Sequence, residues 1–371
     1  MSGARKGLAR GALAIVSLAL TLGAAEGIYR WKTAAEDAPG GGDDEGYQEW
    51  RRRYRHMNET IYARSDERAL IYEPVPGASV PMEYGPAAFN EGAMREDREV
   101  SPEPPPDTTR VAMIGDSLVW SEFLPVHDSL PRRTEEALGE GWEVLNFGVT
   151  GYDTTQEAAW YERAVRPYHP DVVVVVWCMN DMMIMSGPFE RFADDEERAR
   201  KDAQEALMAR VAPVRRETID GVLEQRERDA TFKILARALG IWERWRFDRD
   251  YDDEYLVAFR QPERRARAAR AIRRLGALLR ADGVPGLFVI SPVLEAWDAY
   301  HWGSIHDFLR GEAEAAGLTV LDPLPTWRAD ERESEMHVGG DNLHYDQSGA
   351  RVFGRTVAPA LEALAAGGGG A

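Results

Sequence analysis

The sequence has a single cysteine, Cys178, among its 371 residues, so no disulfide can form within the chain. Positive charge is also in the minority, because 45 lysines and arginines stand against 63 aspartates and glutamates, for a formal net charge of −18. An acidic excess of this size disfavours a nucleic-acid backbone as a partner. The seven histidines show no metal-ligand spacing on a shared element. We therefore expect no nucleic-acid partner, no metal and no cofactor.

The N-terminus carries an apolar run of limited length. Arg5, Lys6 and Arg10 precede the apolar residues 11–25. That run is short for a spanning helix, which needs about 20 residues, although extension over residues 8–29 would allow a tilted span. The same pattern fits a cleaved signal peptide. We expect residues 1–31 to be a membrane anchor, with a secreted chain as the alternative and a soluble cytoplasmic chain as the least favoured. In both leading cases the rest of the chain lies outside the cytoplasm.

Composition divides the remaining chain into segments. Residues 32–106 read as a spacer and N-terminal extension, with a flexible stretch over 33–46 and a proline-rich boundary at 101–106. The main domain is expected over residues 107–364, followed by a flexible tail over 365–371. Within the domain, residues 189–263 are densely charged and helix-prone, and they include an aromatic cluster of Trp242, Trp245, Phe247, Tyr251 and Tyr255. This stretch is interpreted as a helical insertion, either a plain decoration or a lid over the active site.

The main domain alternates strands and helices. Apolar strands are predicted at residues 110–114, 142–147, 172–177, 287–290 and 318–321, with helices over 156–165, 264–280, 305–316 and 349–364. Such alternation predicts a three-layer α/β/α domain around a parallel five-stranded sheet, with the helical insertion after the third strand. Right-handed crossovers leave few topologies, and the flavodoxin-like order is the one we expect.

Polar residues follow the predicted strands where each strand ends. Ser117 comes after the first strand, Gly151 after the second, Asn180 after the third, and Asp341 and His344 after the fifth. Carboxyl ends of parallel strands meet at one edge of the sheet, where open α/β folds bind ligands. The sequence therefore predicts a single site that contains all five residues.

The residue types at this edge suit acyl transfer to a serine. A serine hydroxyl needs a base to become a nucleophile, and an imidazole needs a carboxylate to fix its tautomer. Ser117, His344 and Asp341 supply these three groups. The developing oxyanion needs positioned donors, for which we expect the backbone N–H groups of Ser117 and Gly151 and the Asn180 amide. Asp116 is expected to cap the helix that begins at Ser117.

These residues occur in four blocks that resemble those of the SGNH/GDSL hydrolase family. The blocks are Gly115-Asp116-Ser117-Leu118, Gly151, Asn180-Asp181 and Asp341-x-x-His344. The resemblance implies ester hydrolysis by an esterase, lipase or carbohydrate O-deacetylase, without a metal. One position departs from the family pattern, because Cys178 stands where the third block usually has glycine.

The expected protein is a membrane-anchored serine ester hydrolase that forms an acyl-enzyme on Ser117. Its substrate is expected to be a small-molecule or glycan ester. Two alternatives stay open at this point: an O-acyltransferase that acts on exported polysaccharide, and a catalytically silent glycan-binding or assembly protein with the same fold.

Overall fold

The computed structural model describes residues 44–183, 189–202, 254–295, 297–330, 335–338 and 341–368. The chain divides into two compact units, one of residues 1–50 and 211–254 and the other of residues 51–210 and 255–371. The expected anchor, most of the insertion, and the aromatic residues Trp242, Trp245, Phe247 and Tyr251 lie outside the described residues. Within the described ranges, every helix is too short or too polar to cross a membrane.

A five-stranded parallel sheet forms the centre of the second unit. Its strands are β5 (Thr109–Gly115), β6 (Trp142–Gly148), β7 (Val172–Trp177), β8 (Gly286–Ile290) and β9 (Thr319–Leu321). They lie side by side in the order β6-β5-β7-β8-β9, and every pair is parallel. This is the predicted flavodoxin-like order. All six residues of β7 are buried, as the unbroken apolar run predicts for a strand covered on both faces.

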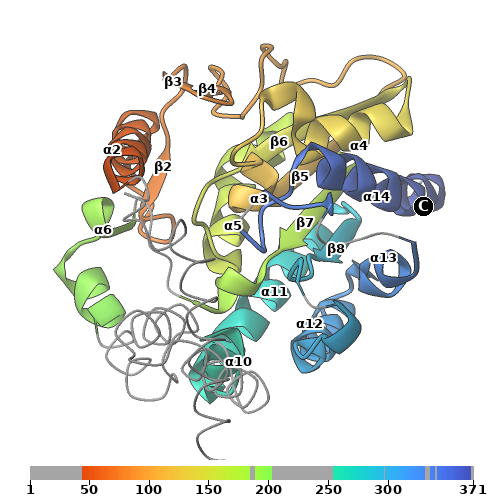
Figure 1. The fold of residues 1–371 in the computed structure, drawn as a ribbon. Helices are drawn as coiled ribbons and strands as arrows, with labels where there is room; N and C mark the ends of the chain where they lie inside the picture. The colour runs from red at the N-terminus through yellow and green to blue at the C-terminus, as the bar shows by residue number, and fades with distance from the viewer. Residues whose placement is uncertain are drawn as a thin grey trace, which may run out of the picture. The chain divides into compact units, whose positions relative to one another are not determined.

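Helices cover both faces of this sheet (Figure 1). One face packs against α5 (Thr154–Trp160), α11 (Pro262–Asp282) and α12 (Gly303–Ala315), and the other against α4 (Leu130–Leu138) and α14 (Gln347–Gly368). Side chains alternate along each strand, so Val173 and Val175 join the first core cluster whereas Val174 and Val176 join the second. The predicted three-layer arrangement is confirmed.

Shorter elements complete the described chain. They are α2 (Asp44–Ile61), β1 (Tyr62–Arg64), β2 (Tyr72–Pro74), β3 (Ser79–Met82), β4 (Gly85–Ala88), α3 (Ser117–Trp120), η1 (Val126–Asp128), η2 (Tyr161–Val165), η3 (Arg166–Tyr168), η4 (Met179–Met182), α6 (Phe189–Phe192), α10 (Glu254–Phe259), η5 (Trp297–Ala299) and α13 (Leu324–Asp330). Strands β1 and β2 form one antiparallel pair, and β3 and β4 form another.

The segment before β5 is more ordered than its composition suggests. Helix α2 begins at Asp44, inside the stretch expected to be a flexible spacer. Met57, Tyr72 and Phe89 are buried in the same core cluster as β5 and β7. Residues 51–106 therefore belong to the same compact unit as the sheet, and the proline-rich run at 101–106 does not separate two units.

The C-terminal helix is longer than predicted. Helix α14 continues to Gly368, so residues 365–368 of the expected flexible tail are helical. Ala365 and Ala366 have the highest helix propensity and extend a helix that Phe353, Val357 and Leu361 anchor in the core.

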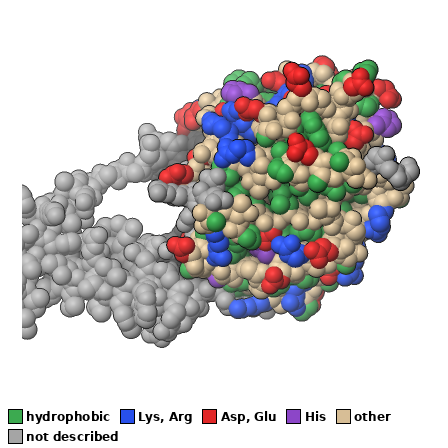
Figure 2. Space-filling model, turned by 90° about the vertical axis from the view of Figure 1, so that its right-hand side faces the viewer, with side chains coloured by type: hydrophobic (Ala, Val, Ile, Leu, Met, Phe, Trp, Pro, Cys, Tyr) green, Lys and Arg blue, Asp and Glu red, His purple; other side chains and the backbone are tan. Residues whose placement is uncertain are grey.

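The face of the molecule seen in Figure 2 intersperses acidic, basic and hydrophobic side chains.

Candidate active site

Ser117 is placed by the turn between β5 and α3. Asp116 caps that short helix, because its Oδ1 accepts a hydrogen bond from the Leu118 N–H at 2.9 Å, as predicted. The turn is tight where β6 ends beside it. A Cβ added to Gly148 would lie 2.2 Å from the Trp120 nitrogen, so glycine is required for this close approach. Ser117 is thus held at the carboxyl edge of the sheet by the packing of two strand ends against one helix.

Asp341 and His344 meet Ser117 from a loop more than 200 residues later in the chain. The Ser117 Oγ lies 2.8 Å from Nε2 of His344, and Nδ1 of His344 lies 2.7 Å from Oδ2 of Asp341. The other Asp341 oxygen accepts from the Leu343 and His344 N–H groups at 2.8 and 2.9 Å. The three residues therefore form a continuous hydrogen-bonded chain with the geometry of a serine hydrolase triad.

The surroundings of Asp341 and His344 favour the charged forms of both side chains. Burial alone would raise the pKa of Asp341, but the hydrogen bond and charge of His344 and two backbone N–H groups lower it to about 2. Burial alone would lower the pKa of His344, yet the hydrogen bond and charge of Asp341, with Glu122 and Asp116, raise it. The imidazole is therefore a stronger base than a free histidine, which suits proton abstraction from Ser117.

The predicted oxyanion donors lie on the loops around Ser117. Gly151 has a φ of +81°, and its loop is tied to β5 because the Val149 N–H donates to the Gly115 carbonyl at 3.0 Å. Among the described residues, no acceptor pairs with the N–H of Gly151 or with that of Ser117. The Asn180 Nδ2 donates to Asp116 Oδ2 at 2.7 Å, which orients the amide and leaves its second N–H for a ligand.

The cysteine that replaces the usual glycine fits without backbone strain. Cys178 has a φ of −117°, an extended conformation open to any residue. Its side chain is buried in the core cluster on the α4 and α14 side of the sheet, and burial raises the pKa of its thiol. The departure from the family pattern is therefore compatible with the backbone conformation at this position.

Sequence reasoning missed a buried carboxylate beside the triad. Glu122 is 3% exposed, lines a recess with Ser117 and His344, and its Oε1 has no hydrogen-bond partner among the described residues. The neighbouring Phe123 packs edge-on against the His344 ring at a centroid distance of 5.3 Å. No strand or motif marks these residues, since they lie in the irregular loop after α3.

A buried arginine from the N-terminal segment holds that loop. Ser121 and Phe123 adopt positive φ values of 59° and 70°, which are costly for residues with a Cβ. Arg95 is fully buried and donates to the carbonyls of Trp120, Ser121 and Leu124, the last two at 2.8 and 2.5 Å. It therefore fixes the strained backbone that presents Glu122 and Phe123 to the triad.

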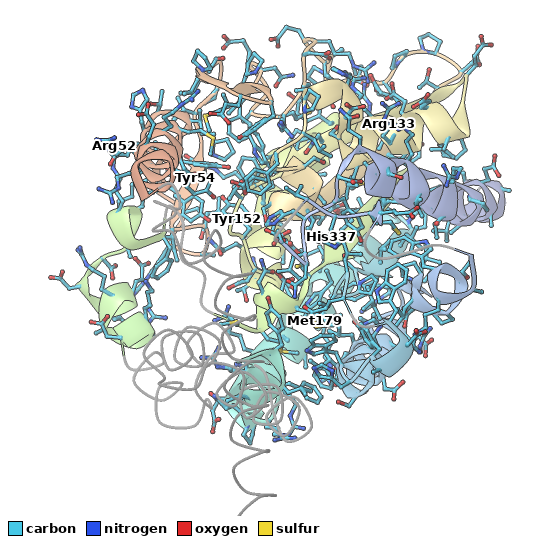
Figure 3. The ribbon with its side chains drawn as sticks, viewed as in Figure 1. Arg52, Tyr54, Arg133, Tyr152, Met179 and His337 are labelled. Atoms are coloured by element: carbon cyan, nitrogen blue, oxygen red, sulfur yellow. The ribbon has the colours of Figure 1, made fainter. Side chains whose placement is uncertain are left out.

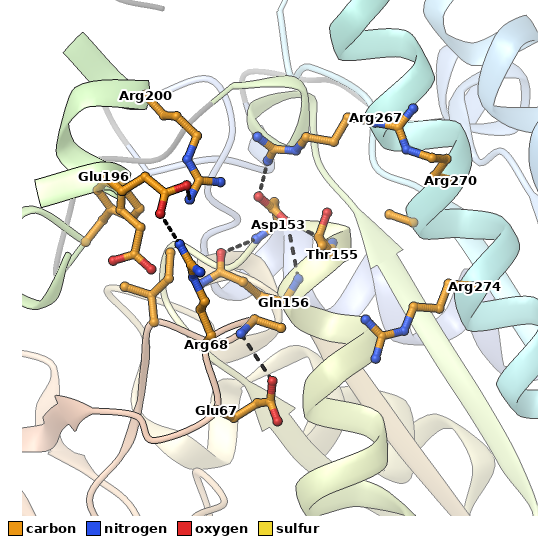
Figure 4. Close-up of a pocket in the computed structure, with 15 residues that line it drawn as sticks. Glu67, Arg68, Asp153, Thr155, Gln156, Glu196, Arg200, Arg267, Arg270 and Arg274 are labelled. Atoms are coloured by element: carbon orange, nitrogen blue, oxygen red, sulfur yellow. Dashed lines mark hydrogen bonds and ion pairs between the residues drawn. The ribbon is translucent and has the colours of Figure 1, made fainter. Parts of the chain in front are cut away.

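The pocket in Figure 4, with a volume of about 830 Å³, lies elsewhere. Its polar walls consist mainly of arginines and carboxylates, and several pair with one another, such as Arg267 with Asp153 and Arg68 with Glu196. None of the five predicted site residues lines it. Hydrogen-bond geometry, rather than volume, identifies the candidate site at Ser117.

Solved structures with similar folds include three with related descriptions. A carbohydrate acetylesterase family member from Sinorhizobium meliloti is 17% identical and covers 70% of this chain and 100% of its own, with a TM-score of 0.36. The native aryl esterase of M. smegmatis is 12% identical over 69% and 100%, with a TM-score of 0.39. A protein described as lipolytic and of the G-D-S-L family, from Desulfitobacterium hafniense DCB-2, is 10% identical over 68% and 99%, also at 0.39. Similarity at this level does not bear on activity.

The sequence itself matches a known family. No curated protein matches the chain. The sequence model of the GDSL-like lipase/acylhydrolase family, however, matches residues 113–352, a stretch that runs from β5 into α14 and contains Ser117, Gly151, Asn180, Asp341 and His344. This match covers more than half of the chain. The chain therefore belongs to the GDSL-like lipase/acylhydrolase family.

Proposed function

We propose that this protein is a serine ester hydrolase that works through an acyl-enzyme on Ser117. The observation that carries the proposal is the hydrogen-bonded chain from Ser117 Oγ through both nitrogens of His344 to Asp341, at 2.8 and 2.7 Å. Packing of the core would not by itself require a hydroxyl, an imidazole and a carboxylate from two distant parts of the sequence to hydrogen-bond in this order. Their arrangement supports general-base activation of a hydroxyl nucleophile.

The reaction follows from the positions of these groups. Ser117 Oγ attacks the ester carbonyl carbon while Nε2 of His344 takes the hydroxyl proton, and Asp341 stabilises the imidazolium. Negative charge gathers on the carbonyl oxygen, which the N–H groups of Ser117 and Gly151 and the free Asn180 N–H stabilise. The imidazolium then protonates the leaving alcohol. A water molecule then attacks the carbonyl of the acyl-enzyme while His344 takes its proton. The acid is released as Ser117 Oγ recovers that proton.

The recess beside the triad favours a small acyl group. Its walls meet so closely that they leave no space for a sphere the size of a water molecule. Its walls are Ser117, Leu118, Ser121, Glu122, Leu124, Leu130, His344 and Tyr345. Three leucines suit a short alkyl group, and an acetyl or propionyl group would displace these walls less than a long chain. We therefore place the protein among short-chain esterases, with acetylated sugars as one substrate class to test.

A series of p-nitrophenyl esters tests this function. For a protein that comprises residues 44–371, we expect kcat/KM to be highest with the acetate ester. We expect it to be at least tenfold lower with the octanoate ester. A second assay uses acetylated xylose or glucose as the substrate. It separates hydrolysis from acyl transfer by measuring both the release of acetate and the transfer of the acetyl group to an added oligosaccharide. A flat or rising series with chain length would contradict the short-chain assignment, and transfer without acetate release would make the protein an acyltransferase.

We also propose that residues 1–31 anchor the protein to a membrane with residues 32–371 on the extracytoplasmic side. The support is the charge pattern of the sequence, in which Arg5, Lys6 and Arg10 precede the apolar run at 11–25. Ester groups on an exported polymer or on small molecules outside the cytoplasm would then be the accessible substrates.

A further inference from the structure

We infer that the β1–β2 hairpin, which precedes the family match, positions the oxyanion donor Gly151 through the hydroxyl groups of Tyr72 and Tyr62. This inference rests on the proposed esterase function. The hairpin lies at residues 62–74, whereas the family match begins at residue 113. No strand-end motif leads to these tyrosines, so they form a part of the site that the four family blocks do not contain.

Three hydrogen bonds tie the hairpin to the loop after β6. The Tyr72 hydroxyl donates to the Thr150 carbonyl at 2.7 Å, and the Thr150 N–H donates to the Tyr62 hydroxyl at 3.2 Å. On the other side of Gly151, the Tyr152 hydroxyl donates to the Tyr72 carbonyl at 2.5 Å. The residues before and after Gly151 are thus both held by the hairpin.

The Tyr72 contact has a direct consequence for the Gly151 N–H. The Thr150 carbonyl and the Gly151 N–H belong to the same peptide unit, which is planar and has its C=O and N–H on opposite sides. A hydroxyl that fixes the direction of the carbonyl therefore fixes the direction of the N–H. Without the hydrogen bond from Tyr72, this peptide unit could rotate more easily, because Gly151 permits a wide range of φ.

The surroundings make these bonds firm. Tyr62 and Tyr72 are 2% and 0% exposed, so water does not compete for their hydroxyls. Their rings contact each other edge-on at 5.5 Å, and Tyr72 also contacts the Tyr152 ring at 5.2 Å. In Figure 3, Tyr152 lies in the middle of the unit, while Tyr54 lies on the inner side of α2 and Arg52 on its outer side. The hairpin thus contacts the Gly151 loop through buried hydroxyl groups and packed rings.

The test replaces single hydroxyls without changing ring packing. Tyr72→Phe and Tyr62→Phe remove the two contacts. Tyr161→Phe is the matched control, since the hydroxyl of buried Tyr161 donates to Asp282 at the end of α11 and not to the Gly151 loop. Each variant is assayed for kcat and KM with p-nitrophenyl acetate, and its Tm is measured. Loss of one oxyanion donor costs about 10²- to 10³-fold in kcat, so misalignment of that donor in Tyr72→Phe should cost about tenfold or more, with KM changed less than about twofold.

The outcomes separate this inference from the proposed function. A fall in kcat for Tyr72→Phe, absent from a Tyr161→Phe variant with a similar Tm change, supports the positioning role. Unchanged kcat in folded Tyr72→Phe, or equal losses in both variants, overturns it. If Tyr72→Phe does not fold, Tyr62→Phe decides: it frees the Thr150 N–H, one peptide unit before the Gly151 N–H, so a smaller fall in kcat that is absent from Tyr161→Phe supports the role of the hairpin, and an unchanged kcat overturns it. The proposed function fails separately, if Ser117→Ala keeps the wild-type rate in the same assay.

Discussion

Asp341 hydrogen-bonds to His344, which in turn lies beside Ser117, and Asp341 and His344 share one short loop. Replacement of Asp341 by asparagine keeps the size of the side chain but removes the charge that raises the pKa of His344. The new side-chain amide would also present an N–H toward Nδ1 of His344 and favour the wrong tautomer. We expect kcat for p-nitrophenyl acetate to fall about 10³- to 10⁴-fold in Asp341→Asn, with KM changed little. A loss below tenfold in a folded variant would show that Asp341 is not the orienting carboxylate.

Glu122 lines the same recess as His344 and also affects the pKa of His344. Its charge raises the pKa of His344, and only the neutral imidazole acts as base. Activity is therefore lost as pH falls through the His344 pKa, and Glu122→Gln should move this acid limb of the kcat/KM profile to lower pH. Glu73→Gln is the control, because it removes an equal charge on the hairpin where Glu73 pairs with Arg163 at 2.7 Å. Equal shifts in both variants, or no shift in Glu122→Gln, would contradict the assignment.

At the scale of the elements, the position of α3 depends on the end of β6. A methyl group at Gly148 would meet the backbone of Val119 and Trp120 at 2.6 and 2.2 Å, and backbone cannot move aside cheaply. Gly148→Ala should therefore destabilise the fold by about 1–3 kcal/mol and displace Ser117 from His344, so that activity falls further than stability explains. Urea unfolding and esterase assays measure the two effects.

Helix α12 supplies the control for this substitution. A Cβ at Gly311 would meet nothing within 4 Å, and the residue lies inside a helix. Gly311→Ala should keep full activity and stabilise the protein by about 0.5–1 kcal/mol, because alanine loses less backbone entropy in a helix. Full activity in Gly148→Ala would show that α3 tolerates a shift at this point.

The sheet and its site residues were predictable at this scale for a physical reason. Buried parallel strands need continuous apolar runs, as in Val172–Trp177, and their carboxyl ends converge by geometry alone. Ser117, Gly151, Asn180 and His344 could be brought together on that basis. Glu122, Arg95 and Tyr72 could not, because their contacts join irregular loops through side-chain hydrogen bonds that leave no period in the sequence. The strands β2 to β4 were missed for a different reason, since they are three or four residues long and contain prolines and a glycine.

At the scale of the whole molecule, the N-terminal anchor remains a prediction. Full-length protein expressed in a bacterial host should sediment with membranes and resist extraction with high salt, because apolar burial rather than charge would hold it. A variant that lacks residues 1–31 should be soluble and keep kcat/KM, since the residues that form and support the site lie between Tyr62 and Tyr345. Full-length protein that is found intact in the soluble fraction would contradict an uncleaved anchor, and loss of the first residues on secretion would support the signal-peptide alternative.

The central claim is that Ser117, activated by His344 and Asp341, is the nucleophile of an ester hydrolase. Reaction with a fluorophosphonate, followed by intact-mass and peptide mass spectrometry, tests this claim most directly, because the reagent reacts preferentially with a serine that a neighbouring base activates. We predict one adduct per chain on Ser117, slow labelling in His344→Ala, and none in Ser117→Ala. An adduct that persists in Ser117→Ala, or no adduct in the folded wild-type protein, would contradict the account.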